Sequence, residues 1–221
     1  MGIDFSFILK SSGVFGKAML MTINLGIVGI IFSILIGLII EISRYFKIKF
    51  LNYFFIGYIE FSRNTPLLIQ IFFLYYGLTK FGIKLTGYQC GVIGLSFLGG
   101  AYMAEAIRGG VESVEKAQIE SAMSLGLSKF QILTNIVTPI SLSVSIPTIV
   151  ANCIFLMKET SIIASIAVAE LMFVTKDAIG MYYKTNEALI LVVISYLIIL
   201  LPISILSRIL ERRLRYGEFG R

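Results

Sequence analysis

The chain has 221 residues, of which 57% are hydrophobic and 14% charged, and its formal net charge is +6. This composition predicts a single domain embedded in a lipid bilayer, because the hydrophobic content far exceeds what a soluble core needs. The sequence contains no histidine, which excludes a histidine-ligated metal site, a Ser-His triad and a histidine proton relay. The basic residues are spread between apolar stretches and favour an anionic membrane face over nucleic acid as their partner. Cys90 and Cys153 each lie in an apolar run and are predicted to be small buried hydrophobes without a disulfide.

Five apolar segments predict an all-α membrane protein with five transmembrane helices. The first uncharged run, residues 18–40, is long enough to cross about 30 Å of hydrocarbon and too long for a cleavable signal peptide. Gly29, Ser33 and Gly37 recur along it at four-residue intervals, so another helix is expected to approach closely there. The alternative is that glycine is simply common in membrane helices. The expected spans are residues 18–43, 54–80, 85–108, 141–168 and 188–210, within one transmembrane domain covering residues 1–221.

The second segment contains charged residues and a proline. Glu60 and Arg63 interrupt it before Pro66. Proline lacks a backbone donor and restrains the residue before it. We therefore expect a membrane-surface approach followed by a tilted span that is broken at residues 64–66.

Charges also mark the later segments. The third segment ends at Glu105 and Arg108, which are one helical turn apart and are predicted to pair. The fourth carries the polar run 158–161, Lys-Glu-Thr-Ser, in its middle. Residues 167–186 contain several charges and are expected to form an external connection with one short helix. The fifth segment contains Pro202 and leads into a basic tail.

Residues 117–137, between the third and fourth segments, are far less apolar than their flanks, and we call them the elbow. Their apolar residues recur at three- and four-residue intervals, which predicts two short amphipathic helices. Gly126 can take the left-handed conformation that ends the first helix, and Ser128 can cap the second. From the pattern alone, the elbow either packs on its own bundle or needs a partner. The apolar residues are Ile119, Ala122, Met123, Phe130, Leu133 and Ile136.

Lysine and arginine are distributed unevenly over the two sides of the predicted bundle. The positive-inside rule makes the richer side cytoplasmic. The elbow and the C-terminal tail are therefore predicted to be cytoplasmic and the N-terminus to be outside. The richer side holds Arg44, Lys47, Lys49, Arg108, Lys116, Lys129, Arg208, Arg212, Arg213, Arg215 and Arg221, and the poorer side holds Lys10, Lys17, Lys80, Lys84, Lys176 and Lys184.

The elbow resembles a motif of permease subunits in bacterial ABC importers. The run Glu120-Ser121-Ala122, followed by Gly126, is similar to the EAA motif of those subunits, and a later isoleucine and proline also match. Ser121 and Thr138 depart from the motif's usual alanine and leucine. In that family the motif forms the coupling helix that docks on the ATPase subunit, so the resemblance implies the MetI-like type I ABC importer permease fold. The coupling residues that it implies are Glu120, Ser121, Ala122, Gly126, Phe130, Ile136 and Pro139.

Three further motifs resemble the polar amino acid group of these permeases, also called the histidine, glutamate, glutamine and arginine group. Residues 62–70, SRNTPLLIQ, are similar to its R-G-T-P-L-L-x-Q signature, with Asn64 in place of glycine. Residues 158–161 are similar to its K-[DE]-T-S segment, and residues 100–110 match its A-Y-x-x-E-x-x-R-G-G run. The resemblance extends over nearly the whole chain, residues 18–210.

A transported amino acid would need a fixed cation and a fixed anion within the membrane. Arg63 offers a planar fork for the carboxylate, and Glu159 can take the ammonium. Helix breaks beside both residues would expose backbone groups to the path. The alternative is that Arg63 pairs with Glu60, and Lys158 with Glu159 or another helix, only to neutralise charge. The expected substrate path consists of Arg63, Asn64, Thr65, Glu159, Thr160 and Ser161.

The resemblance implies a pore subunit in a bacterial inner membrane, and not an enzyme. Two such subunits, identical or paralogous, would form the pore, two ATPase subunits would dock on the elbows, and an extracytoplasmic binding protein would deliver a polar amino acid. The sequence contains no P-loop, so ATP and Mg²⁺ are expected on the ATPase and no cofactor on this chain. One alternative is an ion-coupled secondary carrier using Glu60, Glu159 and Glu170. Another is a membrane-embedded enzyme, for which we find no catalytic constellation.

Overall fold

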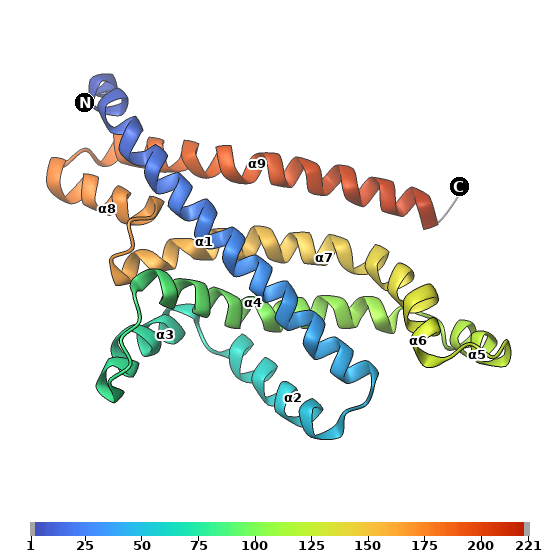
Figure 1. The fold of residues 1–221 in the computed structure, drawn as a ribbon. Helices are drawn as coiled ribbons and strands as arrows, with labels where there is room; N and C mark the ends of the chain where they lie inside the picture. Colours follow the sequence, from blue (N-terminus) through green and yellow to red (C-terminus); the bar gives the residue numbers. More distant parts are fainter. Residues whose placement is uncertain (1–2, 219–221) are drawn as a thin grey trace.

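The computed structural model describes residues 3–218, with side chains through Ile209, and this part of the chain is helical with short connections (Figure 1). The basic-tail residues Arg212, Arg213, Arg215 and Arg221 lie outside the described side chains. The α-helices are α1 (Phe5–Tyr45), α2 (Lys49–Asn64), α3 (Leu67–Phe72), α4 (Gly87–Glu112), α5 (Lys116–Ser124), α6 (Lys129–Ile132), α7 (Thr138–Glu159), α8 (Leu171–Tyr182) and α9 (Thr185–Glu218). Two segments are wider π turns, η1 (Phe73–Gly77) and η3 (Leu133–Val137). Two others are tighter 3₁₀ turns, η2 (Leu78–Phe81) and η4 (Thr160–Ile166).

Four helices of the described part are long and apolar enough to cross a membrane: Phe5–Tyr45, Gly87–Glu112, Lys129–Ile166 and Thr185–Ile209. The second expected span, residues 54–80, is divided, because the chain turns between α2 and α3 (Figure 1). Thr65 at this turn is extended, with φ −113° and ψ 127°, as expected for a residue before proline. The predicted break is confirmed, but the segment forms two shorter helices.

The fourth expected span also ends differently from its prediction. Helix α7 stops at Glu159, so the polar run 158–161 lies at the end of the α-helix and not in its middle. The Thr160 hydroxyl donates to the Met157 carbonyl at 2.7 Å, and the chain continues as the 3₁₀ turn η4. A threonine hydroxyl that bonds a preceding carbonyl competes with the regular helical pattern, which is consistent with a change of helix type here.

The outer ends of the first and last long helices extend beyond the predicted spans. Helix α1 begins at Phe5 because the Asp4 carboxylate accepts the Phe7 N–H at 3.1 Å. Helix α9 begins at Thr185. Between η4 and α9, the expected external connection contains the short helix α8, as predicted.

Helices α1 and α4 pack closely at the centre of the bundle. A Cβ atom at Gly29 would lie 2.9 Å from the Leu95 Cβ atom, and one at Gly37 would lie 2.7 Å from the Met103 Cβ atom. The Ser33 hydroxyl between them donates to the Gly29 carbonyl at 2.7 Å, so it adds no unsatisfied polar group. The predicted close approach along the small-residue face is confirmed. The core around it contains Leu25, Leu67, Ile71, Cys90, Leu95, Leu98, Met103, Leu156, Ile163, Ile166 and Val168.

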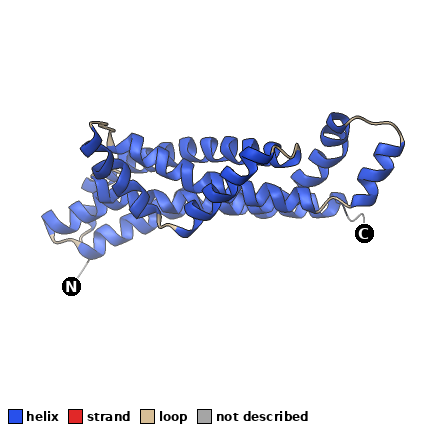
Figure 2. Cartoon of the chain, turned by 90° about the horizontal axis from the view of Figure 1, so that it is seen from below, coloured by secondary structure: helices blue, strands red, loops and turns tan. Residues whose placement is uncertain are grey.

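The bundle is elongated and its two ends differ. The N-terminus, α8 and the start of α9 lie together at one end (Figure 1). The elbow and the last turns of α9 lie at the other end. Figure 2 shows the same arrangement from below, with the two chain ends at opposite ends of the long axis. Any site on the elbow is therefore far from a site on α8.

Candidate functional site

The elbow has the two-helix structure that its sequence predicts. Helix α5 ends before Gly126, which is left-handed with φ +81°. The Ser128 hydroxyl accepts the Gln131 N–H at 3.3 Å, and the Gln131 side chain accepts the Ser128 N–H at 2.8 Å. This reciprocal capping box fixes the start of the second helix. The predicted roles of Gly126 and Ser128 are confirmed.

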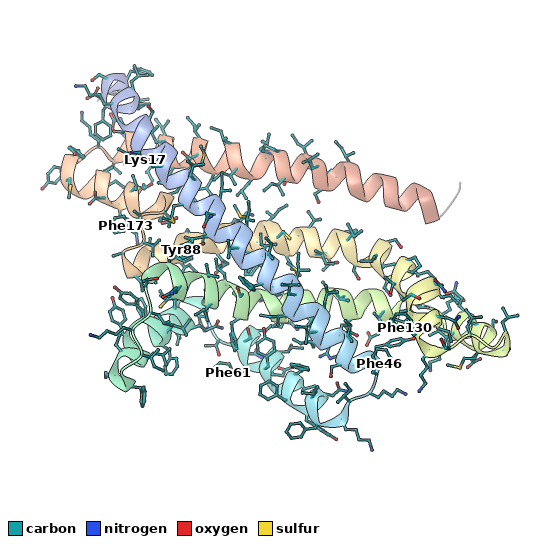
Figure 3. All side chains as sticks on the ribbon, in the orientation of Figure 1. Lys17, Phe46, Phe61, Tyr88, Phe130 and Phe173 are labelled. Atoms are coloured by element: carbon teal, nitrogen blue, oxygen red, sulfur yellow. The ribbon has the colours of Figure 1, made fainter. Side chains whose placement is uncertain are left out.

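The apolar residues of the elbow divide into a buried set and an exposed set. Ala122 and Ile132 are buried, with Val114 and Val137, in a small cluster against which Tyr45 of α1 and Val111 of α4 also pack. Leu125 is 80% exposed, Phe130 66% and Met123 53%. Figure 3 shows Phe130 at the elbow end of the bundle, far from Lys17 and Phe173. The elbow thus packs on itself and on the ends of α1 and α4 with one face and presents an apolar surface with the other.

The expected coupling residues accordingly have two kinds of environment. Glu120, Ser121, Gly126, Phe130 and Pro139 are exposed, whereas Ala122 is buried and Ile136 is partly buried. A shallow hollow of about 450 Å³ lies on the elbow and is lined by Ala117, Gln118, Ser121, Ala122, Leu125, Leu127 and Ile136. The expected set omits Leu125, which occupies one of the unspecified positions between Ala122 and Gly126.

The elbow is joined to α7 without a loop. Helix α6 continues through the π turn η3 into α7, and the Thr138 N–H donates to the Leu133 carbonyl five residues earlier. Pro139 follows at once and has no N–H to give the preceding turn. The second half of the elbow is therefore helically continuous with α7.

The first helix break is stabilised by a buried glutamine. The Gln70 amide nitrogen donates to the Ser62 carbonyl at 3.1 Å and to the Thr65 carbonyl at 3.0 Å. These carbonyls lie where Pro66 interrupts the helical bonds, so Gln70 replaces donors that the helix lacks. The Asn64 side-chain amide donates a hydrogen bond to the Glu60 carbonyl at 2.7 Å.

The two breaks are close to each other in the fold. Helix α3, which follows the first break, packs against η4, which forms the second. Thr160 is fully buried, Glu159 and Ser161 are partly buried, and Arg63 and Asn64 are exposed. The structure thus brings the two expected halves of the substrate path to neighbouring elements, but Arg63 and Glu159 form no ion pair within the described residues.

Arg63 contacts two residues of α4 that the sequence analysis does not pair with it. Its guanidinium lies 3.7 Å from a Glu105 carboxylate oxygen and 5.4 Å from the centre of the Tyr102 ring. Glu60 instead accepts the Asn64 amide at 3.1 Å, so the alternative of an Arg63–Glu60 pair is wrong. Glu105 does pair with Arg108, as predicted, with nitrogen and oxygen 2.8 Å apart.

The family of the chain follows from comparison with known proteins. The family described as the binding-protein-dependent transport system inner membrane component matches residues 29–216. The chain belongs to this family. The solved structure described as an amino acid ABC transporter with histidines is similar to this permease with a TM-score of 0.89 and 30% identity, covering 96% of this chain and all of that chain.

Further relatives support the same fold and family. A Vibrio harveyi protein named as a probable amino-acid ABC transporter permease is 31% identical over 199 residues, which is 89% of each chain. The L-cystine transport system permease protein of Bacillus subtilis is 34% identical and covers 87% of this permease and 83% of its own length. The inward-facing MetNI methionine ABC transporter has a TM-score of 0.72 at 15% identity, over 91% of this chain and 98% of that chain. The expected MetI-like permease fold is confirmed.

Proposed function

We propose that this permease is the pore subunit of an ATP-driven importer that moves a polar amino acid delivered by an extracytoplasmic binding protein. The family description supports a binding protein, and the relatives named for amino acids support the substrate class. The observation that carries the proposal is the exposed apolar face of the elbow, formed by Met123, Leu125 and Phe130. An apolar face rimmed by polar residues at one end of a membrane bundle indicates a protein partner.

The proposed assembly has two permease subunits, identical or paralogous, and two ATPase subunits that bind ATP and Mg²⁺. The subunit is a multi-pass membrane protein, and we place it in the bacterial inner membrane with residues 18–43, 54–80, 85–108, 141–168 and 188–210 in the bilayer. The elbow faces the cytoplasm and the N-terminus lies outside. The elbow and the N-terminus lie at opposite ends of the bundle, which supports their placement on opposite sides of the membrane, and the lysine and arginine distribution supports the direction (Figure 1).

The elbow is proposed to transmit ATPase closure to the bundle. Because α6 runs through η3 into α7 without a loop, movement of the elbow shifts α7 and the polar run at its far end. Such coupling requires that the ATPase bind the two arrangements of the bundle with different affinities. The expected coupling set, Glu120, Ser121, Ala122, Gly126, Phe130, Ile136 and Pro139, combines exposed contacts with residues that hold the elbow together.

The substrate path is proposed to include Arg63, Asn64, Thr65, Glu159, Thr160 and Ser161. Arg63 would bind the substrate carboxylate, and Glu159 would bind the ammonium. The packing of α3 on η4, the exposure of Arg63 and the partial exposure of Glu159 support this proposal. The family and relatives support an ATP-driven importer and give no support to an ion-coupled secondary carrier.

Site-specific photocrosslinking tests the partner. A photoreactive phenylalanine replaces Phe130 in cells that express the permease with its ATPase subunit. We expect a crosslinked product that contains the ATPase. The control is the same substitution at Tyr183, which is 88% exposed at the other end of the bundle and is expected to give no ATPase product. ATPase capture from both positions, or from neither, would overturn the coupling role of the elbow.

A further inference from the structure

Glu105 is the meeting point of three arginines from three helices. One carboxylate oxygen lies 3.1 Å from Arg44 of α1. The other lies 2.8 Å from Arg108 of α4 and 3.7 Å from Arg63 of α2. This arrangement links a residue of the proposed substrate path to the helix that leads into the elbow. The sequence predicts the pair with Arg108, but neither the sequence motifs nor the proposed function assigns Glu105 a role in substrate binding.

The three contacts differ in strength. Arg44 and Arg108 donate hydrogen bonds to Glu105, whereas 3.7 Å is too long for one from Arg63. Arg44 and Arg108 also have second carboxylates of their own, Glu41 at 3.4 Å and Glu112 at 2.7 Å. Glu105 therefore remains neutralised when Arg63 leaves, and the loss of the weakest contact leaves the others in place.

Arg63 is prepared to bind a second anion. Its side chain is 42% exposed, and Glu105 is its ion-pair partner in the part of the chain with described side chains. The ring of Tyr102 lies beneath the guanidinium, with 5.4 Å between the Arg63 Cζ atom and the ring centre, so it attracts the cation without using its N–H donors. A planar guanidinium in this position retains N–H donors that suit a bidentate carboxylate.

We propose that Glu105 is a positioning residue that holds Arg63 until the carboxylate of a substrate displaces it. The inference rests on the proposed substrate path. Glu105 and the substrate then compete for one guanidinium, so the site discriminates by the presence of a carboxylate. Substrate binding also separates α2 from α4 at this contact, and α4 is followed by only three residues before the first helix of the elbow.

Ligand binding to the purified permease–ATPase complex, without the binding protein, tests the competition. The probes are the common L-amino acids and L-cystine, and for each that binds, the analogue in which the α-carboxylate is a carboxamide. The variants are Glu105→Gln, Arg63→Gln and, as a matched control, Glu112→Gln. Glu112 contacts Arg108 in the same network but lies two helical turns beyond Glu105 and does not contact Arg63.

We expect Glu105→Gln to bind the amino acid about fivefold more tightly, the scale of one partly exposed ion pair, with no change for the carboxamide. Glu112→Gln is expected to keep the wild-type affinities, and Arg63→Gln to lose the preference for the carboxylate. A purely structural role for Glu105 would change both ligands equally. Glu105→Asp, which keeps the charge but shortens the reach to Arg63, is expected to act in the same direction and serves if the glutamine variant does not assemble.

The outcomes separate this inference from the proposed function. If Arg63→Gln abolishes the carboxylate preference but the Glu105 variants leave it unchanged, the inference is wrong and the substrate path stands. If Arg63→Gln retains the preference for the carboxylate, Arg63 is outside the path, and both the inference about Glu105 and the proposed role of Arg63 in the substrate path are wrong. Absence of binding by any probe to the wild-type complex would likewise remove both.

Discussion

At the scale of single residues, Gly37 of α1 lies directly against the backbone of α4. A Cβ atom there would lie 2.7 Å from the Met103 Cβ atom and 2.9 Å from the backbone nitrogen of Ala104. Backbone atoms cannot move aside as a flexible side chain does, so the two helices must separate to admit a methyl group. Gly13, in the same helix, has no neighbour within 4 Å of such an atom.

We therefore predict that Gly37→Ala destabilises the protein by about 1–3 kcal/mol, the usual cost of overpacking. Gly13→Ala is the matched control and should leave the melting temperature unchanged or raise it slightly, because alanine favours a helix. A thiol-reactive dye measures unfolding in detergent, since Cys90 is buried and Cys153 is partly buried until the bundle opens. Equal melting temperatures for the two variants would contradict the close approach.

At the scale of elements, local conformations were predictable from the sequence, whereas the partners of long-range contacts were not. The left-handed Gly126, the Ser128 cap and the break before Pro66 depend on neighbours within one or two turns, so the sequence contains the whole cause. The contact of Arg63 with Glu105 depends on how α2 packs on α4, which no spacing within either helix specifies. The same holds for the division of the elbow's apolar residues into buried Ala122 and exposed neighbours.

The elbow and the outer turn before α4 provide a matched pair of left-handed glycines. Gly126 has φ +81° and Gly82 has φ +83°, and neither has an atom within 4 Å of an added Cβ. Alanine at either position should cost about 1–2 kcal/mol of local strain. We predict that Gly126→Ala weakens ATPase association, measured by co-purification, by up to about tenfold, whereas Gly82→Ala does not. Equal effects of the two substitutions would show that the elbow conformation does not matter for docking.

At the scale of the whole molecule, polar contacts tie the outer ends of the first and last long helices together. The Lys184 ammonium lies 2.9 Å from the Asp4 carboxylate, and the Asp4 N–H donates to Glu187 at 2.9 Å. The hydrogen bond from Lys184 holds the pKa of the Asp4 carboxyl well below its usual range. The pair therefore stays charged at neutral pH, and it holds the corner between α8 and α9 against the start of α1, at the end opposite the elbow.

The proposed orientation predicts which end of the molecule each aqueous compartment reaches. In a background with Cys90 and Cys153 replaced by alanine, a single cysteine at Tyr183 should react with an impermeant maleimide in intact spheroplasts. A single cysteine at Leu125 should react only after permeabilisation, because it lies on the exposed face of the elbow at the other end. Co-expression of the ATPase should protect Leu125→Cys and leave Tyr183→Cys unaffected, since only the elbow is covered by the partner. Labelling of Leu125→Cys in intact spheroplasts would contradict the proposed orientation, because the elbow would then lie outside the cell, where no ATPase could reach it.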